Sequence, residues 1–371
     1  MKPRVLFILQ LPPPYHGASI ANEFIIQSSV VKNAYDTRVI DIKTAESIAS
    51  IGKFSFSKVA LSVKLFFRIL AQLIRFKPQI VYFTIAPTGF AFYRDAVYLM
   101  AIKLFPAKLI IHYHGKGIKA GTDNSALYRF FCKKALRNTY GIHLSGILAG
   151  DVPDYKLRKR YFVPYGVPVT STDTLPVKTE QEKIQVLFLS NYVVDKGIIV
   201  LVDAIKIAAA TCANLQVRLV GNAGTISNEA LQAYINDQKL ENIVSVCGPR
   251  YRDEKYRELI NADIFVLPTF YANEAFPVSL LEAMQYGLAI ISTREGGIPD
   301  MIENNVTGLL VNKRDAINLA EKIIFLVNNE EARKNIGANA RRAFMEKYTL
   351  DHFEKNIFRV LEDVLSSETT T

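Results

Sequence analysis

Two glutamates eight positions apart carry the chemistry that this sequence suggests most directly. Glu274 lies in an expected loop after an apolar stretch that ends at Leu267, and Glu282 lies about one turn inside a helix predicted over 278–286. Carboxylates accept paired hydrogen bonds from vicinal hydroxyls, which suits a ribose and a hexose. One ligand lying across the helix start could therefore meet both side chains.

The start of that helix adds backbone N–H groups to the two carboxylates. Amides near the helix start have no partner within the helix, and with the positive end of the helix dipole they favour a diphosphate. The four residues concerned are Phe276, Pro277, Val278 and Ser279. The combination predicts a nucleotide sugar as ligand. An isolated pair of glutamates is more often a loop charge and a solvated helix residue, so the surrounding residues must decide.

The surrounding stretch, 263–311, resembles the donor-binding region of the retaining GT-B glycosyltransferases of family 4 type. That family carries E-x7-E between a strand and a helix, then a G-G turn and a T/N-G-x-L-V return. Here the glutamates are followed by GGIPD at 296–300 and TGLLV at 307–311. The resemblance implies that Glu282 binds the ribose, that Glu274 contacts the transferred sugar, and that the helix start binds the diphosphate.

A second segment, SNYVVDKG at 190–197, resembles the family's G-R-x4-K-G pattern. Lys196 matches the lysine that binds the donor phosphates, while Asn191 stands where the family has an arginine. A hydrogen bond to a charged group contributes about 1.5–3 kcal/mol, against about 1 kcal/mol for a neutral one. The phosphate clamp is therefore weaker, or another cation compensates. The candidates for that cation are Arg250, Arg252 and Arg294.

Three further turns resemble family positions near the donor. The turn at Gly248 and Arg250 normally touches the nucleobase through its backbone. His114, at the end of a strand, resembles the histidine that faces the donor sugar in polysaccharide-assembling members, and strand alternation predicts that His112 points to the opposite face. Gly17 resembles the glycine of the first-domain loop near the reacting centre, and it equally fits a plain tight turn.

Two parallel sheets are needed to position these residues. Short Val/Ile/Leu runs that alternate with helical stretches are typical of strands buried on both faces. We expect strands near 5–9, 37–42, 80–85, 108–112 and 141–144, and again near 186–189, 216–220, 243–246, 263–267, 288–292 and 309–311. The expected fold class is α/β, a GT-B fold of two Rossmann-like doubly wound domains facing each other across a cleft.

The intervening helices are expected near 19–31, 57–76, 92–105 and 124–137, and then near 196–210, 227–238, 253–260, 278–286, 314–328, 330–345 and 350–365. We expect an acceptor-binding domain over 1–168, a linker over 169–183 and a donor-binding domain over 184–348. Residues 349–371 should cross back to the first domain. The turn VPYGV at 163–167 resembles the family's V-P-N-G-V, with Tyr165 replacing the asparagine.

Charge divides the chain into two unequal parts. Residues 1–170 carry 24 Lys and Arg against 8 Asp and Glu, whereas the remainder carries 21 against 27. Basic amphipathic stretches at 57–77 and 128–137 fit a bilayer interface, and equally fit core-facing helices with a basic outer face. The excess of positive charge favours peripheral contact with an anionic membrane, and the absence of a recognised module argues against nucleic acid.

Composition excludes several classes of protein. Half of the residues are apolar, so the chain can bury large cores. Three cysteines without a CxxC pair indicate a reducing compartment and no disulfide scaffold. We expect no secretory leader and no transmembrane helix. We also expect no metal and no cofactor, and neither HExxH nor a DxD after a strand, the motifs of metal sites, occurs.

The predicted protein is a cytoplasmic, metal-independent, retaining glycosyltransferase, peripheral at the inner face of the cell membrane. It would move a sugar from a nucleoside-diphosphate sugar to a glycan or a polyprenyl-phosphate-linked acceptor in surface polysaccharide or lipopolysaccharide synthesis. The expected catalytic residues are Glu274, His114 and Lys196. Two alternatives stay open: a nucleotide-sugar epimerase of the same fold, and a non-catalytic nucleotide-sugar-binding subunit of a glycan assembly complex.

Overall fold

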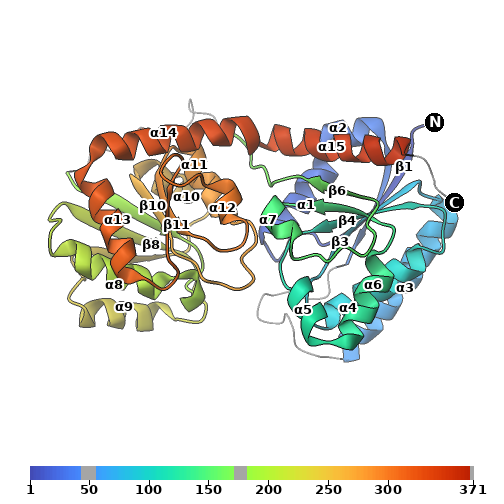
Figure 1. Ribbon diagram of the computed structural model, residues 1–371, viewed down its shortest axis with the longest axis horizontal. Helices are drawn as coiled ribbons and strands as arrows, with labels where there is room; N and C mark the ends of the chain where they lie inside the picture. The colour runs from blue at the N-terminus through green and yellow to red at the C-terminus, as the bar shows by residue number, and fades with distance from the viewer. Residues whose placement is uncertain (43–55, 171–181, 368–371) are drawn as a thin grey trace. The chain divides into compact units, whose positions relative to one another are not determined.

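The computed structural model describes residues 1–42, 56–170 and 182–367, which divide into two compact units. Unit 1 comprises Met1–Gly166 with Leu350–Thr371, and unit 2 comprises Val167–Thr349. Each unit contains one six-stranded sheet (Figure 1). The greater part of the expected linker, 171–181, lies outside the described residues, as do 43–55 and the last four residues.

The sheet of unit 1 has the strand order β2-β1-β3-β4-β5-β6, and every neighbouring pair is parallel. Its strands are β1 (Arg4–Leu9), β2 (Asp36–Asp41), β3 (Ile80–Ile85), β4 (Lys108–Tyr113), β5 (Tyr140–His143) and β6 (Lys159–Phe162). All six residues of β3 are buried, as expected of a central strand covered by helices on both faces. The predicted parallel sheet is therefore confirmed.

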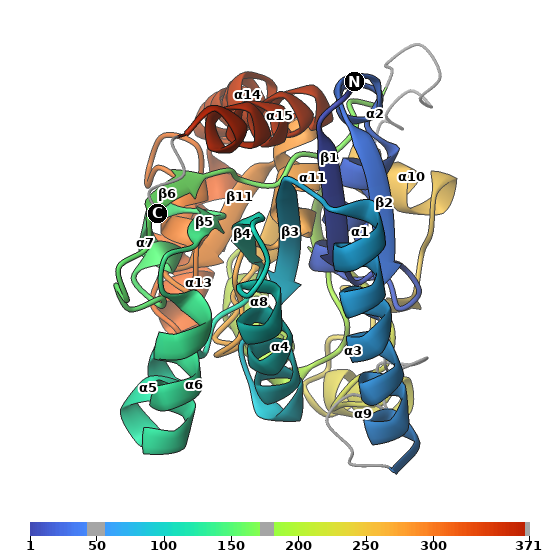
Figure 2. The ribbon, with the colours of Figure 1, turned by 90° about the vertical axis from the view of Figure 1, so that its right-hand side faces the viewer.

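The helices of unit 1 lie on both faces of this sheet (Figure 2). They are α1 (Gly17–Gln27), α2 (Ser29–Ala34), α3 (Phe56–Phe76), α4 (Gly89–Ile102), α5 (Ile118–Asn124), α6 (Ala126–Leu136), α7 (Gly146–Ala149) and α15 (Leu350–Ser366). The helix α15 contacts α1, α2 and β3, and its apolar side chains, such as Phe353 and Ile357, are buried there. The end of the chain thus belongs to the same unit as its beginning.

Unit 2 repeats the arrangement with the order β12-β11-β10-β7-β8-β9, again parallel throughout. Its strands are β7 (Ile184–Leu189), β8 (Leu215–Val220), β9 (Val244–Gly248), β10 (Ile264–Leu267), β11 (Ala289–Thr293) and β12 (Leu309–Val311). Its helices are η3 (Val194–Lys196), α8 (Ile198–Ala209), α9 (Asn228–Asp237), α10 (Asp253–Asn261), α11 (Val278–Gln285), α12 (Ile298–Met301), α13 (Ala316–Asn328) and α14 (Glu330–Lys347).

Three local differences from the predicted elements have simple causes. The helix expected near 19–31 is two helices, because Ser28 leaves the helical region at φ −53° and ψ 122° and caps α2 by accepting a hydrogen bond from Val31. The edge strand β6 was not predicted, because its sequence, KRYF, lacks the apolar run that marked the central strands. The short helices α5, α7 and α12 are too brief to show a period.

A close contact between two glycines joins α14 to the end of α11. A Cβ at Gly337 would lie 2.0 Å from the carbonyl oxygen of Gly287, which is far below any real contact. The helix therefore approaches the turn after α11 at backbone distance, and α14 also contacts β11. This contact fixes the helix that begins beside Glu274.

Replacing Gly337 by alanine should therefore destabilise unit 2. In an exposed helix the change would stabilise by up to about 1 kcal/mol, whereas here overpacking should cost about 2 kcal/mol. Chemical denaturation measures the free energy of unfolding. The exposed Asn335→Ala change on the same helix is the control and should be neutral or slightly stabilising. A stabilised Gly337→Ala protein would contradict the close packing.

Candidate active site at the carboxyl ends of the strands

The sheet of unit 2 reverses its direction of strand addition between β7 and β10. From β7 the chain adds β8 and β9 on one side, and then β10, β11 and β12 on the other. In open α/β sheets the crevice outside the carboxyl ends of strands at such a switch point is where ligands bind. Lys196 follows β7 and Glu274 follows β10, so the fold brings these two predicted residues to the switch point.

Lys196 and Glu274 form a largely buried ion pair. The lysine Nζ lies 2.6 Å from Oε2 of the glutamate, with the side chains 19% and 7% exposed respectively. The same ammonium lies 5.1 Å from the centre of the Tyr271 ring, at a distance suited to a cation–π contact. Two residues 78 positions apart in the sequence therefore neutralise each other's charge.

Glu274 is held by contacts on both its side chain and its backbone. The buried hydroxyl of Thr269 donates to Oε2 at 3.2 Å, and the hydroxyl of Thr293 donates to the carbonyl of Thr269. The backbone amide of Glu274 donates to the carbonyl of Tyr271 at 2.8 Å. The sequence did not identify Thr269, because a single threonine after a strand carries no pattern.

Glycines are required at the two turns that bring the ion pair together. Gly197 has φ +84°, and a Cβ there would lie 2.1 Å from the carbonyl oxygen of Pro268. Gly296 has φ +54°, and a Cβ there would lie 2.1 Å from the carbonyl oxygen of Glu274. Both positions combine a left-handed backbone with a close approach that an L-residue with a side chain cannot make. Lys196 itself ends the 3₁₀ turn η3 rather than opening a helix as predicted, and α8 begins at Ile198.

The helix α11 begins where the E-x7-E spacing predicted. Pro277 is its N-cap residue, and within the described residues no side chain caps the helix. Phe276 and Pro277 are buried, whereas Val278 and Ser279 are partly accessible. Glu282 lies on the second turn and pairs with Lys255 at 2.5 Å. The two glutamates thus belong to separate ion pairs, and neither has the other's lysine as its partner.

The candidates for the missing arginine differ in their surroundings. Asn191 is exposed after β7. Arg250 lies 3.7 Å from Glu258, which also makes two hydrogen bonds with Arg218. Arg252 caps α10 with φ +48°. Arg294 is exposed in the loop after β11, two residues before the glycine that contacts the Glu274 backbone.

The turn at Gly248 is organised by Tyr192. The Gly248 amide donates to the Tyr192 hydroxyl at 3.1 Å, and that hydroxyl donates to the carbonyl of Leu219 at 2.6 Å. Burial raises the pKa of Tyr192 to about 12, so the phenol keeps its proton. The carbonyl of Gly248 in turn accepts from the Gly221 amide at 3.0 Å, so both backbone polar groups of this glycine are engaged by the protein itself.

In unit 1, His114 lies just beyond the end of β4, next to a second histidine. Its Nδ1 is joined to the hydroxyl of Tyr165 by a 2.7 Å hydrogen bond. The rings of His112 and His114 are 3.8 Å apart, so the expectation that His112 faces the opposite side is wrong. The reason is that side chains alternate with a period of two along a strand, so residues two apart, such as 112 and 114, point to the same face.

Burial disfavours the charged form of the histidines in this part of unit 1. Desolvation and the nearby His16 lower the pKa of His114 to about 3, and desolvation with the neighbouring His114 and His143 lowers the pKa of His112. Gly17, at the start of α1, follows His16, whose Nδ1 accepts from the Ser19 amide. Part of the helix start that was expected to face a ligand is therefore capped by the protein.

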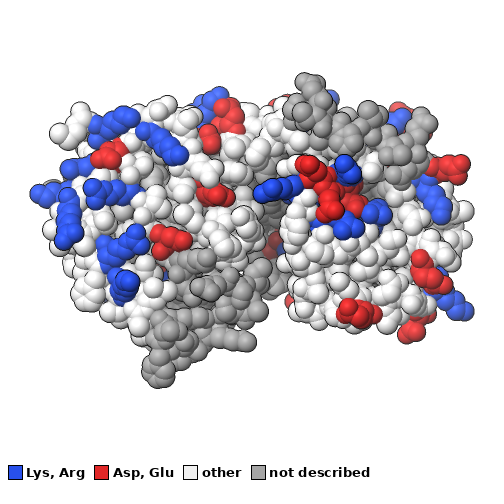
Figure 3. Space-filling view, turned by 180° about the vertical axis from the view of Figure 1, so that it is seen from behind, with Lys and Arg blue, Asp and Glu red and all other residues white. Residues whose placement is uncertain are grey.

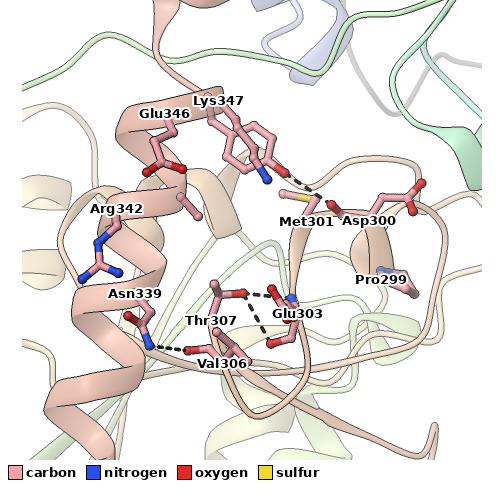
Figure 4. Close-up of a pocket in the computed structure, with 12 residues that line it drawn as sticks. Pro299, Asp300, Met301, Glu303, Val306, Thr307, Asn339, Arg342, Glu346 and Lys347 are labelled. Atoms are coloured by element: carbon pink, nitrogen blue, oxygen red, sulfur yellow. Dashed lines mark hydrogen bonds between the residues drawn. The ribbon is translucent and has the colours of Figure 1, made fainter.

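A cavity of about 370 Å³ lies elsewhere in unit 2, near α12 and α14 (Figure 4). Its polar groups bond to one another: Thr307 accepts from the Glu303 amide, and Asn339 donates to the carbonyl of Val306. It collects none of the predicted site residues. Within the described parts of the chain, no cluster of three or more His, Cys, Asp or Glu side chains is arranged to hold a metal ion.

Known proteins resemble this chain in sequence over part of its length. Residues 172–343 match the family model described as glycosyl transferases group 1. The chain is 29% identical over 195 residues to the amylovoran biosynthesis glycosyltransferase AmsK of Erwinia amylovora, covering 48% of this chain and 47% of that one. It is 28% identical to the capsular polysaccharide biosynthesis glycosyltransferase CapM of Staphylococcus aureus, covering 46% and 45%. The chain thus spans about half the length of these relatives.

Solved structures match over nearly the whole chain. A glycosyltransferase from Rickettsia africae superposes with a TM-score of 0.75 at 16% identity, covering 99% of this chain and 100% of that one. HepE of Anabaena in complex with UDP-glucose superposes with a TM-score of 0.69 at 16% identity, covering 97% and 99%. The predicted GT-B fold is confirmed. The stretch that resembles the group 1 glycosyltransferases is therefore residues 172–343, which lie within the second unit.

Proposed function

We propose that this protein is a metal-independent, retaining glycosyltransferase that uses a nucleoside-diphosphate sugar and acts on a glycan or lipid-linked glycan acceptor in surface polysaccharide synthesis. The observation that carries the proposal is the Lys196–Glu274 pair, formed at the strand-order switch point beside the uncapped start of α11. A cation for phosphate, a carboxylate for sugar hydroxyls and helix amides for the diphosphate lie in one unit.

In this proposal, residues of unit 2 provide the electrostatic stabilisation that a metal ion provides in metal-dependent enzymes. Lys196 and the amides of Val278 and Ser279 would stabilise the charge that develops on the departing diphosphate. Glu274 would hold the transferred sugar, and Glu282 would accept from the ribose hydroxyls. Phe276 and Pro277 shape the turn in which the diphosphate would lie, and Gly248 with Arg250 would contact the base. In unit 1, His114 would hydrogen-bond a substrate oxygen, with Gly17 in the neighbouring loop after β1.

Arg294 is the cation that we propose in place of the arginine missing at Asn191. Arg250 already faces the carboxylate of Glu258 at 3.7 Å. Arg294 is exposed and lies two residues from Gly296, whose backbone contacts that of Glu274. Since no ion pair with Arg294 occurs among the described residues, its charge is available near the proposed diphosphate site.

The relatives support the biological role. Their names assign AmsK to amylovoran biosynthesis and CapM to capsular polysaccharide biosynthesis, and the HepE structure contains UDP-glucose. The same class of donor and of product is proposed here.

Thermal-shift screening against free nucleotides and nucleotide sugars tests the donor class. A specific nucleoside-diphosphate sugar at 100 times its Kd should stabilise the protein by about 2.7 kcal/mol, because ligand bound to the native state adds to its stability by mass action. The nucleoside diphosphate should stabilise as well. If no member of the panel raises Tm, the donor proposal fails.

The product then separates transfer from the alternatives. A retaining transferase needs an acceptor and keeps the anomeric configuration, which NMR of the product reports. An epimerase converts the donor alone, and a non-catalytic subunit binds the donor without turnover. Either of these two outcomes would overturn the proposed activity.

Substitutions of the ion pair distinguish its functional role from its structural role. Lys196→Ala leaves Glu274 buried without its cation, so it should cost about 3 kcal/mol of stability and also abolish transfer. The double variant Lys196→Ala/Glu274→Ala should recover most of the stability but none of the activity. Chemical denaturation and donor-dependent product formation are the two measurements.

Lys206→Ala is the matched control for charge removal. This lysine lies on α8 and donates to the neutral Gln238 at 2.7 Å, so its loss leaves no buried acid unpaired. Stability and transfer should both stay near those of the wild type. Full activity in the double variant would show that neither member of the pair takes part in the reaction.

We also propose that one helical face of unit 1 contacts an anionic membrane at the inner face of the cell membrane. The helix α3 buries Leu65, Ile69 and Leu73 in the core and still exposes Phe67 and Ile74 beside Lys64 and Arg68. The same helix can therefore pack against the core and also present a basic, partly apolar face to a bilayer, so the two interpretations of 57–77 are compatible. Among the described residues, no helix is long and apolar enough to cross a membrane.

The helices α4 and α6 extend the same face, since α3 contacts α4 and α4 contacts α6 (Figure 2). Leu104, Leu127 and Phe130 are exposed there. Lys103 donates to the carbonyl of Lys134, and burial with the charges of Arg137 and Lys134 lowers its pKa to about 8. Basic side chains outnumber acidic ones on the side of unit 1 drawn in Figure 3. Crowded cations favour an anionic partner.

Vesicle flotation tests this surface. The protein should float with phosphatidylglycerol vesicles and not with phosphatidylcholine vesicles, and Phe67→Ser with Phe130→Ser should reduce the bound fraction several-fold, because both rings are more than half exposed beside basic residues. Phe325→Ser on α13 of unit 2 is the control, since that ring is also exposed, at 44%. Equal binding to both vesicle types would contradict the proposal.

A further inference from the structure

Two tyrosine–histidine pairs lie side by side in the core of unit 1. Tyr82 bonds to Nδ1 of His112, and Tyr165 bonds to Nδ1 of His114 at 2.7 Å. The two imidazole rings are 3.8 Å apart. The Nε2 atoms of both histidines are buried, and within the described residues neither has a hydrogen-bond partner. Tyr165 is the residue that stands where the related turn has an asparagine.

Both histidines are neutral, so each ring carries a single proton. Burial and neighbouring charges lower the pKa values of His112 and His114, and two imidazolium ions at this separation would repel each other. A neutral imidazole has one N–H donor and one acceptor nitrogen, and the hydrogen bond at one nitrogen decides which of them carries the proton.

The partner on Nδ1 of His114 is a phenol that keeps its proton. Burial raises the pKa of Tyr165, so its hydroxyl is present as O–H. An imidazole lone pair is a far better acceptor than a phenol oxygen, and the stable arrangement therefore has the tyrosine as donor. The proton of His114 then lies on Nε2.

We propose that Tyr165 is a positioning residue that fixes His114 as a neutral ring with its N–H at Nε2, ready to donate to a ligand oxygen. The ring is held on two sides, by the hydroxyl of Tyr165 and by the face of His112. Tyr165 is itself held by an edge-on contact with Phe353 of α15, at 6.5 Å between ring centres. The geometry thus sets the tautomer and the direction of the ring together.

The orphan N–H is the reason for assigning this group to a ligand. A buried donor without an acceptor costs about 1–3 kcal/mol, and a hydroxyl or phosphate oxygen that enters the site would remove that cost. That the oxygen belongs to a substrate of sugar transfer rests on the proposed function, whereas the tautomer of His114 does not.

Nitrogen-15 NMR of protein labelled at its five histidines tests the tautomer directly. The signals of His114 are assigned by their loss in His114→Gln. In the wild type, Nε2 should be the protonated nitrogen and Nδ1 an unprotonated nitrogen shifted by its hydrogen bond. In Tyr165→Phe the Nδ1 signal should move towards the position of an unbonded ring nitrogen. A wild-type spectrum with the proton on Nδ1 overturns the proposal and needs no variant to fold.

Tyr113→Phe is the matched control. Tyr113 belongs to β4, its hydroxyl is buried, and it has no hydrogen-bond partner in the described part of the chain. This variant removes the same atom from the same core and should leave the His114 signals in place. An equal shift of Nδ1 in both variants would mean a general loosening of the core and would overturn the specific role.

Kinetics separate this proposal from the proposed function. With the donor identified by the thermal-shift panel, Tyr165→Phe should lower kcat about 5- to 10-fold and leave the donor KM nearly unchanged, while Tyr113→Phe should keep kcat. A protein that transfers no sugar but shows the Nε2–H tautomer would end the proposed function and leave the positioning role. An active enzyme with unchanged kcat in Tyr165→Phe would end the positioning role alone.

Discussion

The ion pair between Lys196 and Glu274 is the constraint on which the second unit depends. A carboxylate that is 7% exposed must have a cation beside it, because removal of one partner from such a pair costs several kcal/mol. The pair forms only if the turn after β7 and the loop after β10 approach each other at backbone distance. Gly197 allows that approach, since a Cβ there would lie 2.1 Å from the carbonyl oxygen of Pro268. Gly296, in the loop after β11, comes equally close to the carbonyl oxygen of Glu274. The need for a cation beside Glu274 also bears on the chemistry of the site, because the Lys196 ammonium that pairs with Glu274 is the group that would bind a diphosphate.

The two units offer different kinds of group to a ligand. Unit 2 presents formal charges, with Lys196, Glu274, Lys255 and Glu282 in two separate pairs. Unit 1 presents neutral rings, because burial lowers the pKa of His114 to about 3 and that of His143 to about 4. A histidine with such a pKa is not protonated near neutral pH, so His114 is suited to donate a hydrogen bond and not to act as a general acid.

The sequence predicted the sheets well because central parallel strands read as continuous apolar runs, and the structure contains every strand that was expected. It did not predict β6, whose sequence KRYF lies at an edge, nor the break at Ser28 between α1 and α2. For the candidate site, the sequence singled out the residues in spaced motifs, since E-x7-E and K-G have a fixed relation to strand ends. Thr269 and Tyr192 were not found as site residues, because their roles arise from hydrogen bonds between strands distant in sequence. The placement of His112 was wrong because residues two apart in a strand lie on the same face, which agrees with the 3.8 Å between its ring and that of His114.

Two departures from the related sequences have different physical consequences in this structure. Tyr165, in place of an asparagine, is integrated into the core: it bonds to His114 and packs against Phe353. Asn191, in place of an arginine, is exposed, and nothing in its position restores the lost charge. A substitution that is packed into a core changes the geometry of its neighbours, whereas one that removes a surface charge changes the affinity for an anion and leaves the fold alone. Tyr165 should therefore affect how a bound substrate is oriented, and Asn191 should affect how tightly the diphosphate is held.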